Sequence, residues 1–181
     1  RSRGESVLPL PRETIRWLDG LLVGSMILGA LGISIFFGVS GASHWELVLR
    51  LFNSIPYNVL DPVFNKDVSF YVFTLPLLRF VQGWLLSSFI VLLLAVTADY
   101  LAHDAFRGKP LALYPSMRNH LAILGALAFF ALAGSHFLDR YELLFSKNGA
   151  VVGATYADVH ARMVALVLTA ASSVAAGVML L

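Results

Sequence analysis

The residues of this sequence that could do chemistry are ionisable side chains beside long apolar stretches. The densest group occupies two short segments on either side of one loop: Asp139, Arg140, Glu142, Asp158, His160 and Arg162. Ionisable groups next to apolar segments are costly unless they are paired or used, so an ion, proton or metal site is one interpretation. We favour the other, a salt-bridged cluster that ties the loop to the helix ends, because a zinc site needs close ligands. His136 and His160 lie in different segments and show no such spacing.

Histidines near the ends of apolar stretches suggest a second kind of chemistry. The positions are His103, His120 and His136. A neutral imidazole can ligate a haem or chlorophyll, but a lone histidine at such a place is more often an interfacial hydrogen-bonding residue. No two of them have the spacing of a haem-ligand pair. We therefore predict no cofactor and keep pigment or haem ligation as the alternative.

The motifs of common enzyme classes are missing from the sequence. The chain contains no cysteine, which excludes disulfides, thiolate metal sites and cysteine nucleophiles. It also contains no phosphate loop, nucleophile elbow or metalloprotease motif. The sequence therefore predicts that this chain is not an enzyme.

The composition indicates a polytopic membrane protein. Of the 181 residues, 58% are hydrophobic and 13% are charged, whereas soluble domains have about 25% charged residues. The mean hydropathy is +0.77. The formal net charge of +2 is too small to indicate nucleic-acid binding. The bilayer is therefore the first predicted partner, with lipid contacts along the helices.

Four apolar stretches, 20–39, 77–100, 119–138 and 157–181, each supply about the 20 residues that a membrane-spanning helix needs. The segments that precede and connect them are 1–19, 43–55, 56–76, 101–118 and 139–156. The predicted fold class is all-α, a polytopic transmembrane helix bundle of four spans plus a short interfacial helix.

Two connecting segments have structural signals of their own. Residues 43–55 have one apolar face, with Glu46 and Arg50 as an i,i+4 pair on the other, so we expect a short helix that lies flat on the membrane surface. Val68–Thr74 is rich in β-branched and aromatic residues, which predicts a short extended segment. Pro76 then suits the first turn of the next helix.

Small residues recur every fourth position in the first and last spans. Gly20 and Gly24 begin this pattern in the first span. The last span has an unbroken ridge: Ala161, Ala165, Thr169, Ser173 and Gly177. Small residues let two helix backbones approach closely, so we expect the last helix to pack against another helix.

Positive residues predict the orientation of the chain in the membrane. The N-terminal segment and the loop 101–118 together hold seven Lys and Arg residues, against six in the other connections. The first set is denser because its segments are shorter. We therefore expect the N-terminus and this loop in the cytoplasm, and the segments 56–76 and 139–156 on the outer side.

Four segments of the sequence resemble the bacterial membrane proteins called uncharacterised protein family 0182. They are SHWELVLRLFN (43–53), DPVFNKDVSFYVFTLPLLRF (61–80) followed by GWLL, LDRYELLFS (138–146) and GATYADVHAR (153–162). The resemblance implies the bacterial cytoplasmic membrane, with the middle spans of a longer protein that has a large domain outside that membrane. It implies no catalytic or binding residues, because the activity of the family is not established.

A structural or accessory membrane role is the predicted function. The spans hold no charge at their centres, and the prolines lie in loops or at helix entries, which argues against an ion-coupled transport site within these helices. We expect the chain to pack against other transmembrane subunits or against further spans of its own chain. A transporter or channel component is one alternative, and a pigment- or cofactor-contacting subunit of an electron-transfer or photosynthetic assembly is the other. The chain lacks an initial methionine and ends in an apolar run, so we expect a piece of a longer protein.

Overall fold

The structure, a computed structural model, describes residues 12–106, 114–146 and 153–181, and this part of the chain is helical apart from its loops. The long helices are α1 (Arg12–Ser43), α3 (Leu75–Phe106), α4 (Pro115–Glu142) and α5 (Met163–Leu180). The shorter elements are α2 (Trp45–Phe52), two π-helices, η1 (Phe70–Thr74) and η3 (Asp158–Arg162), and a 3-10 turn, η2 (Leu143–Phe145). This confirms the predicted all-α fold.

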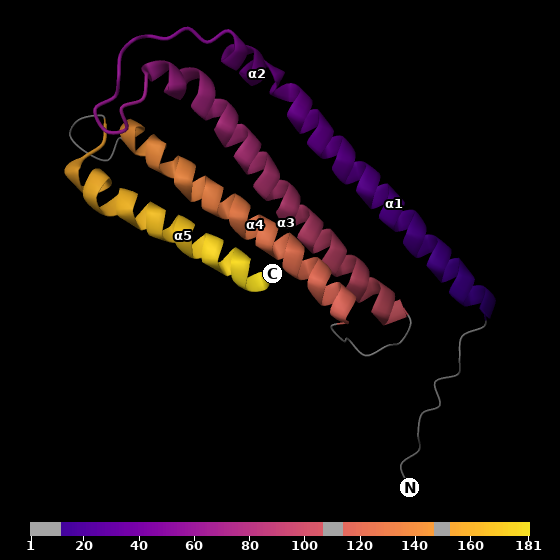
Figure 1. Ribbon diagram of the computed structural model, residues 1–181. Coiled ribbons are helices and arrows are strands. Elements are labelled where there is room, and N and C mark those ends of the chain that lie inside the picture. Colours follow the sequence, from indigo (N-terminus) through magenta and orange to yellow (C-terminus); the bar gives the residue numbers. More distant parts are fainter. Residues whose placement is uncertain (1–11, 107–113, 147–152) are drawn as a thin grey trace.

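The four long helices lie side by side in the order α1, α3, α4, α5 and alternate in direction (Figure 1). Helix α4 packs against both α3 and α5, whereas α1 touches α3 and the short α2. Helix α2 follows α1 after a one-residue break at His44 and bends over the start of α3. We call this end of the bundle, where α2, η1, the end of α4 and η3 lie, the α2 end.

Four helical segments are long and apolar enough to cross a membrane by length and composition: Val23–Phe52, Phe70–Ala105, Pro115–Phe145 and Asp158–Leu180. The first three are longer than the spans expected from hydropathy, because the helices continue into polar residues beyond their apolar centres, and the fourth nearly coincides with the expected span 157–181. Helix α3, for example, extends six residues past the expected end at residue 100, to Phe106. The connections between the helices are correspondingly shorter than expected.

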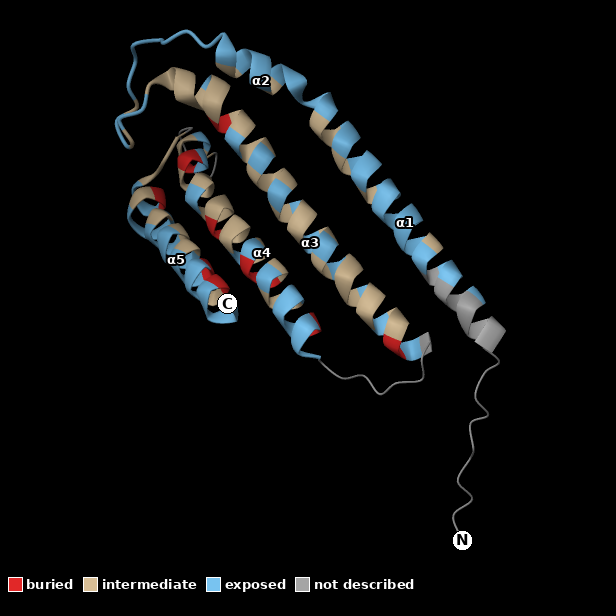
Figure 2. Ribbon diagram, turned by 45° about the vertical axis from the view of Figure 1, so that its right-hand side comes forward, coloured by how far each residue is buried: buried red, intermediate tan, exposed pale blue. Residues whose placement is uncertain are grey.

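The buried side chains lie mainly among α3, α4 and α5 (Figure 2). They include Leu75 on α3 and Ala126, Ala133 and Tyr141 on α4. The apolar side chains of α1 are mostly exposed, with Leu28 at 72%. In a bilayer such a surface contacts lipid or another helix, so the exposed apolar area is compatible with four spans.

The extended segment expected over Val68–Thr74 is wrong, because this segment is helical. Asp67 caps the helix by accepting a hydrogen bond from the Ser69 backbone N–H (2.7 Å). The aromatic rings of η1 then pack on α4, and such tertiary contacts outweigh β-propensity.

Pro76 is the second residue of α3, as predicted, but η1 precedes α3 without a break, so the proline lies inside a continuous helical segment. A proline ring removes one helical hydrogen bond and clashes with the carbonyl four residues earlier. The π-helical turn immediately before Pro76 relieves this clash, since the Leu75 N–H donates to the Phe70 carbonyl five residues back. In contrast, Pro115 is the first residue of α4, where the missing N–H costs nothing.

Candidate functional site

A charged cluster joins α3 to α4 at the α2 end of the bundle. The guanidinium of Arg79 on α3 contacts two carboxylates on α4, with Nη1 2.6 Å from Asp139 Oδ1 and Nε 2.7 Å from Glu142 Oε1. The imidazole Nδ1 of His136 lies 3.3 Å from the second oxygen of Asp139. The Arg79 side chain is 19% exposed. Two carboxylates therefore share one guanidinium, and the imidazole of His136 lies against one of them.

The cluster marks the border of the apolar part of the bundle. No Asp, Glu, Lys or Arg occurs in residues 80–98 of α3 or in residues 119–138 of α4. Each stretch is about 30 Å long at the helical rise, which matches the thickness of a bilayer core. Arg79 and Asp139 therefore stand where the apolar core would meet the headgroup region, and their pairing lowers the cost of charge at that depth.

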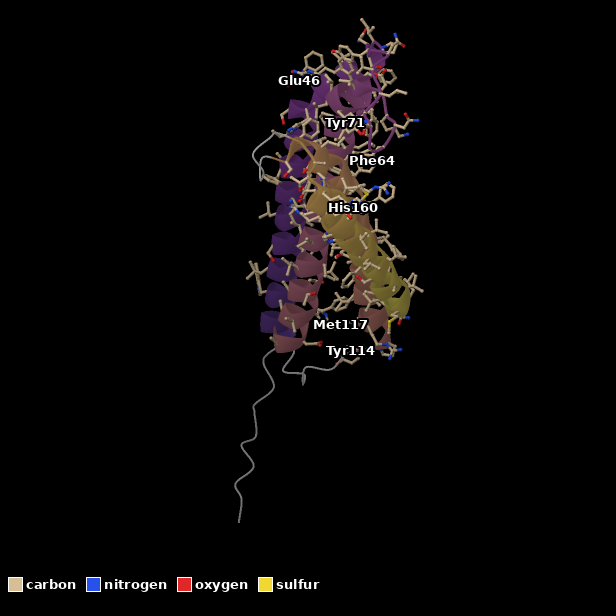
Figure 3. The ribbon with its side chains drawn as sticks, turned by 90° about the vertical axis from the view of Figure 1, so that its left-hand side faces the viewer. Glu46, Phe64, Tyr71, Tyr114, Met117 and His160 are labelled. Carbon is tan, nitrogen blue, oxygen red and sulfur yellow. The ribbon has the colours of Figure 1, made fainter. Side chains whose placement is uncertain are left out.

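Aromatic rings surround the buried Tyr141 of α4 on the same end of the bundle. Its ring centroid lies 4.8 Å from that of Phe64 in the loop and 5.1 Å from that of Phe70 in η1. Tyr71 in η1 contacts Phe145 at 5.9 Å. Figure 3 shows Phe64 and Tyr71 together at this end. The rings thus fasten the loop 53–67 and the start of the α3 helix onto α4.

Asp61 organises that loop through backbone and side-chain hydrogen bonds. Its Oδ1 accepts from the backbone N–H groups of Val63 and Phe64, both at 2.8 Å. Its Oδ2 accepts from the Lys66 N–H at 3.1 Å and from the Tyr71 hydroxyl at 2.6 Å. Burial raises the pKa of the Asp61 carboxyl, but these hydrogen bonds outweigh burial and lower the pKa below its usual value.

Asp67 closes the loop against the first helical turn. Its Oδ1 accepts from the Tyr57 N–H at 3.1 Å as well as from Ser69. Hydrogen bonds from the backbone and side chain of Ser69 lower the pKa of the Asp67 carboxyl. Asn58 and Asn65 adopt positive φ values of 58° and 55°, a conformation that asparagine tolerates better than most residues. The loop is therefore held by its own hydrogen bonds.

Two grooves of the described residues meet at Arg79. One, of about 480 Å³, lies between the start of α3 and the end of α4 and is lined by Tyr71, Leu75, Pro76, Arg79, Glu142 and Phe145. The other, of about 370 Å³, lies between α1 and α3 and is lined by Phe36, Phe37, Ser40, Arg79, Phe80, Gly83, Trp84 and Ser87. We refer to the first as the Glu142 groove.

The structure divides the polar residues that the sequence grouped together. Asp139 and Glu142 pair with Arg79, a residue outside the predicted cluster. Arg140 instead stacks on the ring of Phe137, with 3.5 Å from its guanidinium carbon to the ring centroid. The signal for Arg79 was available in the sequence, since it is the last charged residue before the long uncharged stretch of α3.

The remaining predicted residues form a separate local arrangement at the start of the last helix. The buried Asp158 accepts hydrogen bonds from the Thr155 N–H at 3.0 Å and hydroxyl at 2.8 Å, and Arg162 pairs with it at 3.3 Å. The exposed His160 stacks on Tyr156, with 3.9 Å between ring centroids. Within the described ranges, no ion pair joins segment 158–162 to segment 139–142.

The three histidines considered as cofactor ligands, His103, His120 and His136, lie at different ends of the bundle. His136 belongs to the Arg79 cluster, whereas His103 and His120 lie at the opposite end, near the end of α3 and the start of α4. His120 faces the ring of Tyr100 at 6.3 Å, and His103 Nδ1 is 3.8 Å from Asp104 Oδ1. The described part of the chain contains no group of three His, Cys, Asp or Glu residues arranged to hold a metal ion.

Some of the predicted helix-packing residues are buried between helices, and others are exposed. Ser173 and Gly177 of α5 are buried, and a Cβ placed on Gly177 would lie 2.8 Å from the Phe130 ring and 3.2 Å from the Ala126 carbonyl of α4. Ala161, Ala165 and Thr169 of the same ridge are exposed. In α1, a Cβ on Gly20 or on Gly24 would meet nothing within 4 Å.

Comparisons with known proteins find relatives in bacteria. The sequence profile of the uncharacterised protein family UPF0182 matches residues 13–181. A UPF0182 protein of Synechococcus sp. (strain JA-2-3B'a(2-13)) is 38% identical over 154 residues, which cover 84% of this chain and 18% of the relative. A UPF0182 protein of Desulforamulus reducens is 34% identical over 161 residues, which cover 86% of this chain and 17% of the relative. This chain thus spans less than a fifth of the length of these relatives. No solved structure matches.

Proposed function

Because this chain belongs to the uncharacterised protein family UPF0182, we propose that it is the membrane-embedded segment of a longer bacterial protein and acts as a structural scaffold. In this proposal the helices hold the loop 53–67 and the Arg79 cluster in fixed positions at one membrane surface. They pack against further spans of the same chain or against other subunits of a membrane complex. The segment itself catalyses no reaction.

The observation that supports a scaffold most directly is how the spans use their polar side chains. Gln82 Nε2 of α3 donates to the Ala131 carbonyl of α4 at 2.9 Å, and Trp84 Nε1 donates to the Phe37 carbonyl of α1 at 3.2 Å. These bonds tie neighbouring helices together. Others donate to carbonyls of their own helix: Ser88, Thr97, Thr169, Ser172 and Ser173.

Polar groups used in this way do not provide a path for an ion or a polar solute. A transport site is expected to have ionisable groups or broken helices near the middle of the membrane. The ion pairs between the described residues lie instead near the ends of the long apolar stretches, and those of Arg79 are among them. The arrangement therefore favours a scaffold over a transporter or channel component.

The test of the scaffold proposal is purification of the full-length protein from native membranes in mild detergent. Mass spectrometry and an absorption spectrum are recorded on the same fraction. We expect a colourless protein that migrates in a stable complex or as a single large chain with its helices intact. A pigment or haem band at stoichiometric amounts would support the cofactor alternative, and solute flux by the reconstituted protein would overturn the scaffold proposal.

We also propose that the protein lies in the cytoplasmic membrane, with the N-terminus and the α3–α4 connection in the cytoplasm. The denser positive charge of these segments supports this orientation. This chain contains no native cysteine, so single cysteines can report on sidedness. A cysteine at Ser54 should react with a membrane-impermeant maleimide in intact spheroplasts, and a cysteine at Ser116 should react only after permeabilisation. The reverse pattern would invert the proposed orientation.

A further inference from the structure

We infer that the Glu142 groove binds a primary ammonium group, such as the headgroup amine of an aminophospholipid or a small free amine. The groove combines the half-exposed carboxylate of Glu142, which shares its arginine with Asp139, two aromatic walls and a location at the border of the apolar bundle. The inference rests on the membrane location proposed above and adds a ligand class to it.

The exposed carboxylate of the groove favours a cation. Arg79 is its single cationic lining residue, and it contacts both Asp139 and Glu142. Glu142 uses Oε1 for this contact, and its side chain is 55% exposed. Among the described residues no second donor reaches Glu142. Since a carboxylate can accept about four hydrogen bonds, Glu142 has acceptor capacity left for an ammonium group.

The charged side chains of the loop 53–67 bring no further cation into the groove. Asp61 lies behind Tyr71, whose hydroxyl donates to it at 2.6 Å, and it adds a further negative charge. Lys66 lies over the ring of Phe70, 5.9 Å from the ring centroid, and does not line the groove. An anionic ligand would therefore meet the exposed carboxylate of Glu142, whereas a cation would pair with it.

The walls of the groove favour an organic cation over a metal ion. The rings of Tyr71 and Phe145 lie 5.9 Å apart, centroid to centroid, at an interplanar angle of 73°. Aromatic faces attract ammonium groups through their quadrupoles. Leu75 and Pro76 complete the lining with apolar surface. No three His, Cys, Asp or Glu side chains of the described segments come together as metal ligands.

The depth of the groove favours a lipid as the source of the amine. Arg79 and Asp139 stand at one end of uncharged helical stretches that are about as long as a bilayer core is thick. The headgroups of lipids beside α3 and α4 would lie at this level. An ammonium group on a short polar arm could then reach Glu142 while its acyl chains remain along the apolar helices.

The experiment uses the full-length protein, purified in mild detergent and exposed to an equimolar mixture of phosphatidylethanolamine and phosphatidylglycerol. Native mass spectrometry then measures which lipid stays bound. We expect phosphatidylethanolamine to be enriched roughly fivefold, as one partly exposed ion pair with an aromatic contact would give. Glu142→Gln, which keeps the shape and an acceptor for Arg79, should bring the ratio close to one.

Two further variants separate the groove from general charge effects. Phe145→Leu removes one aromatic wall without touching Arg79 and should lower the enrichment roughly twofold. Glu46→Gln is the matched control, because Glu46 is also an exposed partner of an arginine at the α2 end, outside the groove. It should leave the lipid ratio unchanged.

A second measurement distinguishes the sources of the amine. Ethanolamine is added to protein in lipid-free detergent, and thermal unfolding is compared between wild type and Glu142→Gln. A stabilisation that Glu142→Gln abolishes would support the site with a free amine as its ligand, whereas lipid enrichment without this effect would support the aminophospholipid. Equal behaviour of wild type and Glu142→Gln in both measurements would overturn the inference. Membrane fractionation of the same preparation tests the proposed location separately, since a protein absent from membranes would contradict the proposed function itself.

Discussion

The contact between α4 and α5 and the contact between α1 and α3 differ sharply in closeness. At Gly177 the α5 backbone approaches α4 so closely that a Cβ would lie 2.8 Å from the Phe130 ring. Helix α1 has glycines at similar spacing, yet a Cβ on Gly20 or on Gly24 would meet nothing within 4 Å. Its contact with α3 centres instead on Phe37 and Trp84. A pattern of small residues thus permits a close approach without indicating which helix makes it.

The same contrast separates two kinds of ion pair. Arg79 bridges two helices with its side chain 19% exposed, whereas Arg50 and Glu46 pair along α2 with exposures of 58% and 60%. Buried pairs are costly to break because one charge is left without a partner, while exposed pairs contribute little. The α3–α4–α5 part of the molecule should therefore respond more strongly to substitution than α1 and α2.

The largest effect is expected from Gly177→Leu. The added side chain has no room against Phe130 and the Ala126 carbonyl, so α5 must move away from α4. We expect a loss of about 3 kcal/mol in the free energy of unfolding, measured by thermal or denaturant unfolding of the full-length protein in mild detergent. Gly24→Leu in α1 is the matched control and should have little effect. An equal loss from Gly24→Leu would show that α1 packs against another helix of the full protein.

Arg79→Gln should have the next largest effect. It leaves Asp139 and Glu142 facing each other without a cation, although their partial exposure reduces the cost. We expect a loss of about 2 kcal/mol in the same unfolding measurement. Arg50→Gln, which breaks the exposed pair of α2, should cost about 0.5 kcal/mol or less. Similar losses from the two variants would contradict the partly buried character of the Arg79 ion pairs.

Trp84→Phe tests the looser contact between α1 and α3. It removes the indole donor to the Phe37 carbonyl while keeping an aromatic ring, so we expect a loss of about 1 kcal/mol. The distribution of distances between spin labels on α1 and α3 should also become broader. Ser88→Ala, which removes only a bond within α3, should leave that distance distribution unchanged.

The smallest effect concerns the pH dependence of the loop 53–67. Asp61 and Asp67 have pKa values below their usual range in the folded protein. Their contribution to stability is therefore fully present above the unfolded pKa of about 4 and is lost as the pH falls through the lowered folded pKa values. Hydrogen exchange of the loop amides should accelerate, relative to its intrinsic rate, below about pH 4. Asp61→Asn should weaken protection already at neutral pH and flatten this dependence.

The amino-acid sequence by itself determined the helical class, the four apolar spans and the family. These follow from local properties, since the number of consecutive apolar residues decides whether a helix can cross a bilayer. The turns of the loop 53–67 also depend on local properties, because Asp61, Pro62 and Asn65 favour turns through their own backbone preferences. The amphipathic pattern of 43–55 likewise located α2, although the helix itself covers only Trp45–Phe52.

Only the tertiary structure decided which residues meet. Arg79 contacts Asp139 and Glu142 because α3 and α4 pack with a particular rotation about their axes and a particular offset along them. The pattern of apolar residues determines neither the rotation nor the offset. The aromatic segment 68–74 is helical because its rings pack on Tyr141, a contact between residues far apart in the sequence. The small-residue ridge of α5 is buried only at Ser173 and Gly177, since α5 and α4 come closest where Phe130 and Ala126 face it. Contacts of this kind depend on the relative placement of whole helices, and local sequence does not specify that placement.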